Sequence, residues 1–123
     1  MGYGRKITGG KYHKFKKKKK HSLSRDERKV KLSETTKQKT IRGIGGNFKK
    51  VLLLAQTANV TDSKTKKTKK VKIKNVLETP SNRFLARQNI LIKSAIIETE
   101  LGKAKITNRP SQEGMVQAVL IKE

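Results

Sequence analysis

The sequence of 123 residues has no cysteine, no tryptophan, few acidic residues and no long apolar run. Without cysteine, neither a disulfide nor a thiolate-bound zinc site can form. The longest stretch without a charged residue, Val51 to Thr61, is too short to span a bilayer as a helix. No apolar stretch follows the basic N-terminal residues, as it would in a secretory signal. These absences favour a cytosolic or nuclear protein.

Positive charge is in large excess. Lys and Arg number 32 against 9 for Asp and Glu, a formal net charge of +23. Residues 1–50 hold 18 of the basic and 3 of the acidic residues. Charge of this size repels itself unless a polyanion neutralises it. An anionic membrane would favour an amphipathic helix with Trp or Phe anchors, and the chain has no Trp and three Phe. Nucleic acid is the better partner, because each cation placed on a phosphate releases counterions.

Apolar residues are concentrated in the other part of the chain. Three consecutive aliphatic residues occur only from Val51 onward, in "VLLLA", "ILI", "AII" and "AVLI". The first part therefore cannot bury enough apolar surface to order itself alone. We predict a basic RNA-binding extension over residues 1–42 and a small barrel domain over residues 43–123. The boundary falls near "TIRGIGGN", within residues 38–46.

The second part is expected to be mostly β. Short alternating runs separated by turn residues indicate a small antiparallel β-barrel, with the basic N-terminal arm extended. Strands are predicted over residues 48–60, 69–78, 103–108 and 115–121, and residues 89–100 form one bent strand or two short ones. A helix is expected over residues 81–88, with Ser81 or Asn82 as its cap. The predicted inward side chains are Val71, Ile73, Val76, Ala104, Ile106, Val116, Ala118 and Leu120.

No catalytic constellation is visible. The two histidines, His13 and His21, both lie in the lysine-rich arm without a nearby cysteine or pair of acids. The sequence has no P-loop motif, which nucleoside triphosphatases use to bind phosphates, and no nucleophile elbow. We expect no enzyme activity, no metal site, no cofactor, no membrane association and no small-molecule substrate.

The segment "GGKYHKFKKKKKH", residues 9–21, holds seven lysines and no acid. It is either a solvated tail, an import signal or an arm that binds a polyanion. Tyr12 and Phe15 either stack on bases or are incidental. If the arm binds RNA, its contacts include His13, Lys14, Lys16, Lys17, Lys18, Lys19, Lys20, His21, Arg25 and Arg28.

Two basic stretches contain paired glycines, "YGRKITGGKYHKF" and "IRGIGGNFKK". Glycine allows backbone N–H groups to approach a phosphate closely, while flanking cations supply charge. Asn47 is placed to hydrogen-bond a base edge or a ribose hydroxyl. The alternative is that both stretches are ordinary flexible turns. A further basic segment, "KTKKTKK" at residues 64–70, predicts either an RNA-binding hairpin loop or a solvated tip. Further candidate RNA contacts are Lys50, Lys66, Lys67, Lys69 and Arg83.

RNA is favoured over DNA. The sequence shows no helix-turn-helix, zinc-finger or basic-zipper pattern. Folded RNA offers narrow grooves and junctions in which an extended arm can become ordered.

The arm "GRKITGGKYHKFKKKKKHSLSRD", the hinge "RGIGGNFKK" and the segment "PSNRFLARQNILIKSAIIETELGKAKITNRPSQEGMVQAVLI" cover almost the whole chain. Together they resemble the archaeal–eukaryotic type of ribosomal small-subunit protein eight, in its compact archaeal form. The resemblance implies a β-barrel with a basic N-terminal extension and a cytoplasmic location in the ribosome. The implied partners are small-subunit ribosomal RNA and neighbouring small-subunit proteins.

Where this sequence matches the family's motifs, the resemblance implies that the matching residues bind RNA. Ile44 stands where the family pattern has a cation, and Arg83 and Phe84 depart from it as well. The RNA-facing residues that the resemblance implies are Arg5, Lys6, Thr8, Gly9, Gly10, Lys11, Arg42, Gly45, Gly46, Asn47, Lys49, Ser81, Asn82 and Arg87. Two alternatives remain at this point: a factor that binds pre-ribosomal RNA during assembly, and a DNA-compacting protein.

Overall fold

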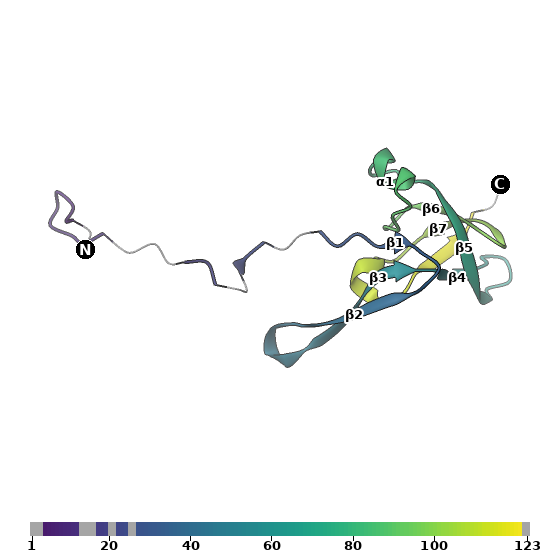
Figure 1. The fold of residues 1–123 in the computed structure, drawn as a ribbon, viewed down its shortest axis with the longest axis horizontal. Coiled ribbons are helices and arrows are strands. Elements are labelled where there is room, and N and C mark those ends of the chain that lie inside the picture. The colour runs from purple at the N-terminus through teal and green to yellow at the C-terminus, as the bar shows by residue number, and fades with distance from the viewer. Residues whose placement is uncertain (1–3, 13–16, 20–21, 25–26, 122–123) are drawn as a thin grey trace.

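The computed structural model describes residues 4–12, 17–19, 22–24 and 27–121. A folded body forms from about residue 30 onward, and the preceding arm extends away from it (Figure 1). The body holds a closed barrel and a separate three-stranded sheet. The prediction of a mostly β protein with a small barrel is confirmed.

The barrel consists of five strands in chain order, β4 (Thr57–Thr61), β5 (Thr68–Glu78), β6 (Ile96–Thr99), β7 (Gly102–Ile106) and β8 (Gln117–Leu120). Each strand pairs antiparallel with the next along the chain. Because the number of alternating strands is odd, the first and the last run in the same direction. The barrel therefore closes through a parallel pair, β4 with β8, and is not antiparallel throughout.

The predicted inward faces fill the barrel. Val71, Ile73 and Val76 of β5 are all buried, although strict alternation would turn position 75 inward. An irregularity in the pairing with β6 lies between Ile73 and Asn75, and this shift keeps Val76 inside. The other predicted positions are also in the core or packed against it: Ala104, Ile106, Val116, Ala118 and Leu120.

The single strand predicted over residues 48–60 is wrong. The chain forms β3 (Phe48–Ala55) and β4, which belong to different sheets and are separated at Gln56. The backbone carbonyl of Gln56 accepts a hydrogen bond of 3.0 Å from the Ile73 amide. Both β3 and β4 contain buried apolar residues. The sequence therefore does not show at which residue the chain leaves one sheet and enters the other.

The second sheet has the order β1–β3–β2, with β1 (Lys31–Leu32) parallel and β2 (Lys37–Arg42) antiparallel to β3. Val30 is fully buried in the core. Its carbonyl accepts a 2.8 Å hydrogen bond from the Leu91 amide, and the Leu32 amide donates to Asn89 at 2.9 Å. The predicted extension over residues 1–42 thus contains two strands that pair with β3. The domain division at residues 42 and 43 stays a prediction, because pairing does not show which part folds alone.

Two short helices complete the body. The predicted helix is present as α1 (Arg83–Arg87), and Asn82 is its cap, with Oδ1 accepting from the Phe84 amide at 3.0 Å. A second helix, α2 (Pro110–Glu113), lies where only a connecting segment was expected, and it packs on β3. Within residues 89–100 only β6 is a strand, and Ile90 makes one isolated bridge with Lys31.

Candidate nucleic-acid interface

The described part of the arm begins with a small basic turn. Arg5 bridges to Lys11, the Lys6 amide donates to the Gly10 carbonyl, and the Gly9 amide donates to Lys6, both at 2.8 Å. The Lys6 ammonium lies 5.8 Å from the centroid of the Tyr12 ring. All of these side chains are exposed, so the turn offers cations on every side.

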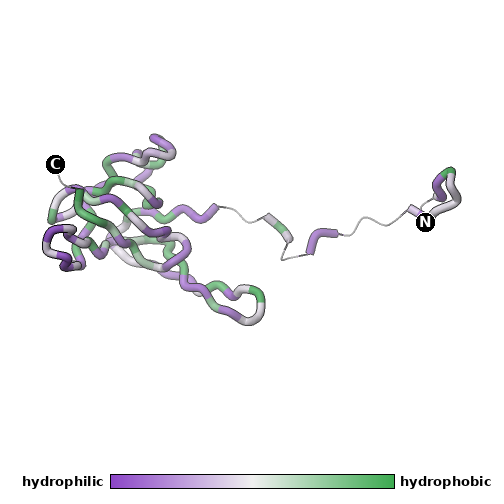
Figure 2. Tube along the Cα trace, turned by 180° about the vertical axis from the view of Figure 1, so that it is seen from behind, coloured by the Kyte–Doolittle hydropathy of each residue, from purple (hydrophilic) through white to green (hydrophobic). Residues whose placement is uncertain are grey.

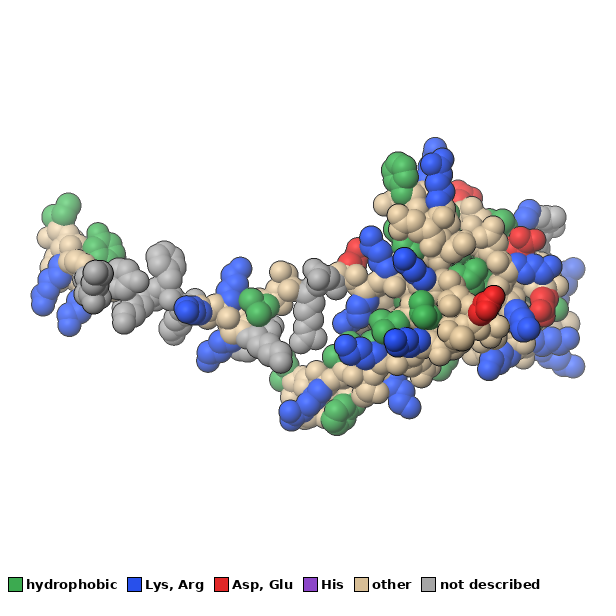
Figure 3. Space-filling model, in the orientation of Figure 1, with side chains coloured by type: hydrophobic (Ala, Val, Ile, Leu, Met, Phe, Trp, Pro, Cys, Tyr) green, Lys and Arg blue, Asp and Glu red, His purple; other side chains and the backbone are tan. Residues whose placement is uncertain are grey.

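The rest of the arm carries further cations. Lys17, Lys18 and Lys19 are exposed, and the Ser22 hydroxyl donates to the Lys19 carbonyl at 2.9 Å. Lys and Arg side chains recur along the described length of the arm, between small and apolar residues (Figure 3). The remaining predicted arm contacts lie outside the described residues: His13, Lys14, Lys16, Lys20, His21 and Arg25.

The segment "RGIGGN" is the loop of the β2–β3 hairpin, and not a hinge between arm and barrel. Gly45 and Gly46 have φ of 73° and 78°, which favours glycine at both positions. The Asn47 Nδ2 donates to the Ile44 carbonyl at 3.2 Å, so this amide holds the loop together. Its Oδ1 is left to accept a hydrogen bond from a partner.

Cations occupy both faces of the hairpin. Directly paired residues share a face, and Arg42 is opposite Phe48 while Thr40 is opposite Lys50. Lys49, between these positions on β3, points to the other face. The predicted contacts Arg42, Lys49 and Lys50 are all exposed. The hairpin thus carries cations on both faces, and the Lys49 ammonium is bonded to Gln112 of α2.

Sequence reasoning missed the apolar character of the hairpin tip. Ile44 is 86% exposed and Phe48 is 72% exposed, and the tip is hydrophobic in Figure 2. Two large apolar residues within a basic loop were the available signal. An exposed aromatic ring beside Arg42 provides a stacking surface for a base.

The loop between β4 and β5 carries the predicted contacts Lys66 and Lys67, and Lys69 follows in β5. Asp62 organises this loop: Oδ1 accepts from the Lys64 amide and Oδ2 from the Thr65 hydroxyl, both at 2.9 Å. The Asp62 carboxylate thus stabilises the turn, and the lysine side chains of the loop are exposed.

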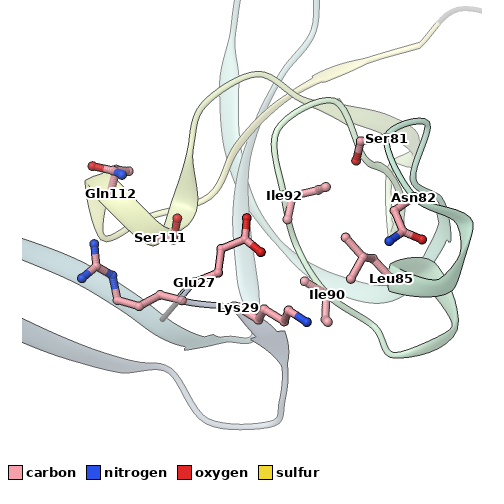
Figure 4. Close-up of a pocket in the computed structure, with 10 residues that line it drawn as sticks. Glu27, Lys29, Ser81, Asn82, Leu85, Ile90, Ile92, Ser111 and Gln112 are labelled. Atoms are coloured by element: carbon pink, nitrogen blue, oxygen red, sulfur yellow. The ribbon is translucent and has the colours of Figure 1, made fainter. Parts of the chain in front are cut away.

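The predicted contacts around α1, which are Ser81, Asn82, Arg83 and Arg87, lie at the surface. Ser81 and Asn82 line a pocket (Figure 4). Arg28, from the base of the arm, is also part of its lining. The structure thereby brings together three predicted residues from two distant parts of the sequence. Ser111 and Gln112 of α2 also line this pocket, and sequence reasoning missed both because only the tertiary fold places them there.

The predicted residues do not form one continuous patch. The hairpin tip, α1 and the β4–β5 loop lie at different corners of the body, and the arm leaves it separately (Figure 1). Residues 27–121 and the shorter described pieces of the arm contain no cluster of His, Cys, Asp or Glu fit to hold a metal ion. In the same residues no helix is long and apolar enough to cross a membrane.

Comparison with known proteins gives one family. The family model for ribosomal protein S8e matches residues 3–121. The chain is 50% identical over 119 residues to the small ribosomal subunit protein eS8 of Methanococcus aeolicus, covering 97% of this chain and 93% of that protein. It is 47% identical to the protein of the same name from Sulfolobus acidocaldarius, again over 97% and 93% of the two chains.

Proposed function

The chain belongs to the ribosomal protein S8e family, and we propose that it binds small-subunit ribosomal RNA through its basic arm, the β2–β3 hairpin and the β4–β5 loop. Members of this family are structural constituents of the small ribosomal subunit and not enzymes. The proposed location is the cytoplasmic ribosome.

The observation that carries this proposal is the arrangement of charge. The chain has a net charge of +23, and much of it lies on projections from a small barrel with an apolar interior; the exposed residues of those projections include Arg5, Lys18, Arg42 and Lys67. A compact body gains nothing from such self-repulsion, whereas a folded RNA neutralises it and releases counterions.

The projections bind in two different ways. The hairpin and the β4–β5 loop are held by strand pairing and by the Asp62 and Asn47 hydrogen bonds, so they present cations in fixed positions. The described residues of the arm make few contacts with one another, so RNA supplies the free energy that orders the arm. Fixed elements set the position of the body on the RNA, and the arm extends the contact into neighbouring grooves or junctions.

Crosslinking of the full chain to small-subunit ribosomal RNA, followed by identification of the crosslinked peptides and nucleotides, tests this proposal. Crosslinks are expected from the arm, from the peptide containing Arg42 to Lys50 and from the peptide containing Lys64 to Lys70. Structured ribosomal RNA should bind more tightly than duplex DNA of equal length. Equal affinity for the two, with crosslinks scattered over the RNA, would indicate non-specific polyanion binding and contradict the proposal.

A further inference from the structure

The pocket beside α1 joins three separate segments of the chain. Its lining comes from residues 27–29 at the base of the arm, from residues 81–92 around α1, and from Ser111 and Gln112 of α2. Its volume is about 560 Å³, within the range of roughly 300–1,000 Å³ that is usual for small-ligand sites. The space is therefore sufficient for one nucleotide.

One side of the pocket is apolar. Ile90 is fully buried, and Leu85 and Ile92 are half-buried beside it. Figure 4 shows Ile92, Ile90 and Leu85 facing the same space from the segment around α1. Leu85 and Ile92, supported by the buried Ile90, form a surface against which the flat face of a base can pack.

The polar groups around this surface have hydrogen-bonding capacity to spare. Asn82 uses Oδ1 as the helix cap, which leaves its two Nδ2 hydrogens. Gln112 uses Oε1 to accept from the Lys49 ammonium at 2.6 Å, which leaves its Nε2 hydrogens. The Ser81 and Ser111 hydroxyls each add a donor and an acceptor. Such a mixture matches the edge of a base, which carries both kinds of group.

Arg28 contributes a cation to the pocket. Its Nε atom is buried and has no hydrogen-bond partner, so an occupant of the pocket is contacted by the other guanidinium nitrogens. Lys29 adds a second cation at the pocket, and Glu27 adds a carboxylate acceptor.

We propose that this pocket binds a single unstacked nucleotide of the RNA, with the base against Ile92 and Leu85 and its phosphate at Arg28 and Lys29. The inference rests on the proposed RNA-binding function and gives it a site that reads a base as well as phosphates. Glu27 accepts from a base amino group, and its negative charge opposes the phosphate of a nucleotide as much as a bare phosphate. The contacts to the base are therefore what favour a whole nucleotide over an isolated anion.

Methyl NMR of the full-length protein tests this assignment directly. The protein, labelled at Ile and Leu methyl groups, is titrated with each ribonucleoside 5′-monophosphate and separately with inorganic phosphate. We expect ring-current shifts at the Ile92 and Leu85 methyls with at least one nucleotide and none with phosphate. Shifts that phosphate reproduces, or methyls unmoved by all four nucleotides, would overturn the proposal.

A pair of matched substitutions connects the pocket to RNA binding. Ser111→Leu places a bulky apolar side chain in the pocket, and Thr107→Leu makes a comparable change at an exposed position after β7, outside the arm, the hairpin and the β4–β5 loop. Ser111→Leu should weaken binding to small-subunit RNA about tenfold, and the salt slope should become shallower by at most about two units, because only the phosphate contacts of Arg28 and Lys29 are lost with the nucleotide. Thr107→Leu should bind as the unsubstituted chain does. A folded Ser111→Leu protein with full affinity would contradict the proposal.

Arg28→Met serves as a second variant in case Ser111→Leu lowers the melting temperature. It keeps the apolar stem of the side chain but removes the guanidinium, and should reduce the nucleotide-induced methyl shifts. Unreduced shifts would show that Arg28 does not contact the nucleotide as proposed. The outcomes also separate the two proposals. If the chain binds RNA but the methyl signals do not move, only the pocket proposal is contradicted. If the chain does not bind RNA, the proposed function is contradicted.

Discussion

Lys49 of β3 donates a hydrogen bond of 2.6 Å from its ammonium to Oε1 of Gln112 in α2. A second bond lies close by, from Gln38 Nε2 to the Gly114 carbonyl, also at 2.6 Å. Together they connect the β2–β3 hairpin to the end of the barrel that carries α2. The hairpin is therefore braced against the body, and its cations have a fixed direction relative to the pocket beside α1.

Gly114 is the tightest point of this brace. Its φ is 73°, and a Cβ placed on it would lie 3.3 Å from the Lys50 carbonyl oxygen. Gly114→Ala should lower the free energy of unfolding by about 1–2 kcal/mol, the cost of a left-handed conformation for a residue with a side chain. Thermal or denaturant unfolding measures this decrease. Gly43→Ala is the control, because Gly43 has a φ of −98° and ordinary contact distances. Equal effects of the two substitutions would contradict a specific constraint at Gly114.

The barrel core should determine stability without determining RNA contact. Ile97 is fully buried in the core cluster. Ile97→Ala should cost roughly 2–5 kcal/mol, since it removes apolar contacts and leaves a cavity. Its RNA affinity, measured where the protein remains folded, should be unchanged. Weakened binding by a fully folded variant would mean that the barrel wall itself contacts RNA.

The alternating pattern of residues 69–78, 103–108 and 115–121 was sufficient to predict three of the five barrel strands, β5, β7 and β8, because each has one buried and one exposed face. The same reasoning failed at Gln56, where an apolar run passes from one sheet to another without any local signal. It also missed α2, whose four residues are stabilised by packing on β3 and by Pro110 at its start.

The candidate site, like the fold, was predicted where a local sequence pattern existed and missed where only tertiary contacts create it. Charge located the arm, the hairpin and the β4–β5 loop, because long-range electrostatics depends on composition more than on fold. The glycine-rich segment was predicted as basic but its place as a hairpin loop was not, since β2 contains only polar and basic residues besides Ile41. Ser111 and Gln112 have no unusual sequence context, and only the fold brings them beside Asn82.

The lysine block of the arm should contribute to binding and not to stability. Replacing Lys16 to Lys20 with Gln should leave the melting temperature of the free protein nearly unchanged, because the described members of the block, Lys17 to Lys19, are exposed. The slope of log affinity against log salt should become shallower by about one unit for each lysine that binds a phosphate in the unsubstituted chain. Melting and RNA affinity are measured at one salt concentration, and affinity again over a salt series. If the Gln variant melted at a lower temperature but bound RNA normally, the lysine block would contribute to the fold, and the prediction would be wrong.

Phe48 at the hairpin tip should act on RNA alone. Because its side chain is 72% exposed, Phe48→Ala should not change the melting temperature. If the ring stacks on a base, RNA binding should weaken by about 1–3 kcal/mol. Phe48→Leu is the matched variant, which keeps an apolar side chain and removes the aromatic face. Full affinity in the Leu variant would point to apolar contact, with a neighbouring protein or a sugar, in place of stacking.

The salt dependence of binding to small-subunit ribosomal RNA tests the central claim most directly. The full chain should show log affinity falling linearly with log salt, with a slope of about −7 to −9 for on the order of ten phosphate contacts. That slope requires the arm and the projections of the body to bind together. A slope of about −2, which corresponds to only two or three phosphates, would mean that one local site on the body carries the interaction, and would contradict an extended interface.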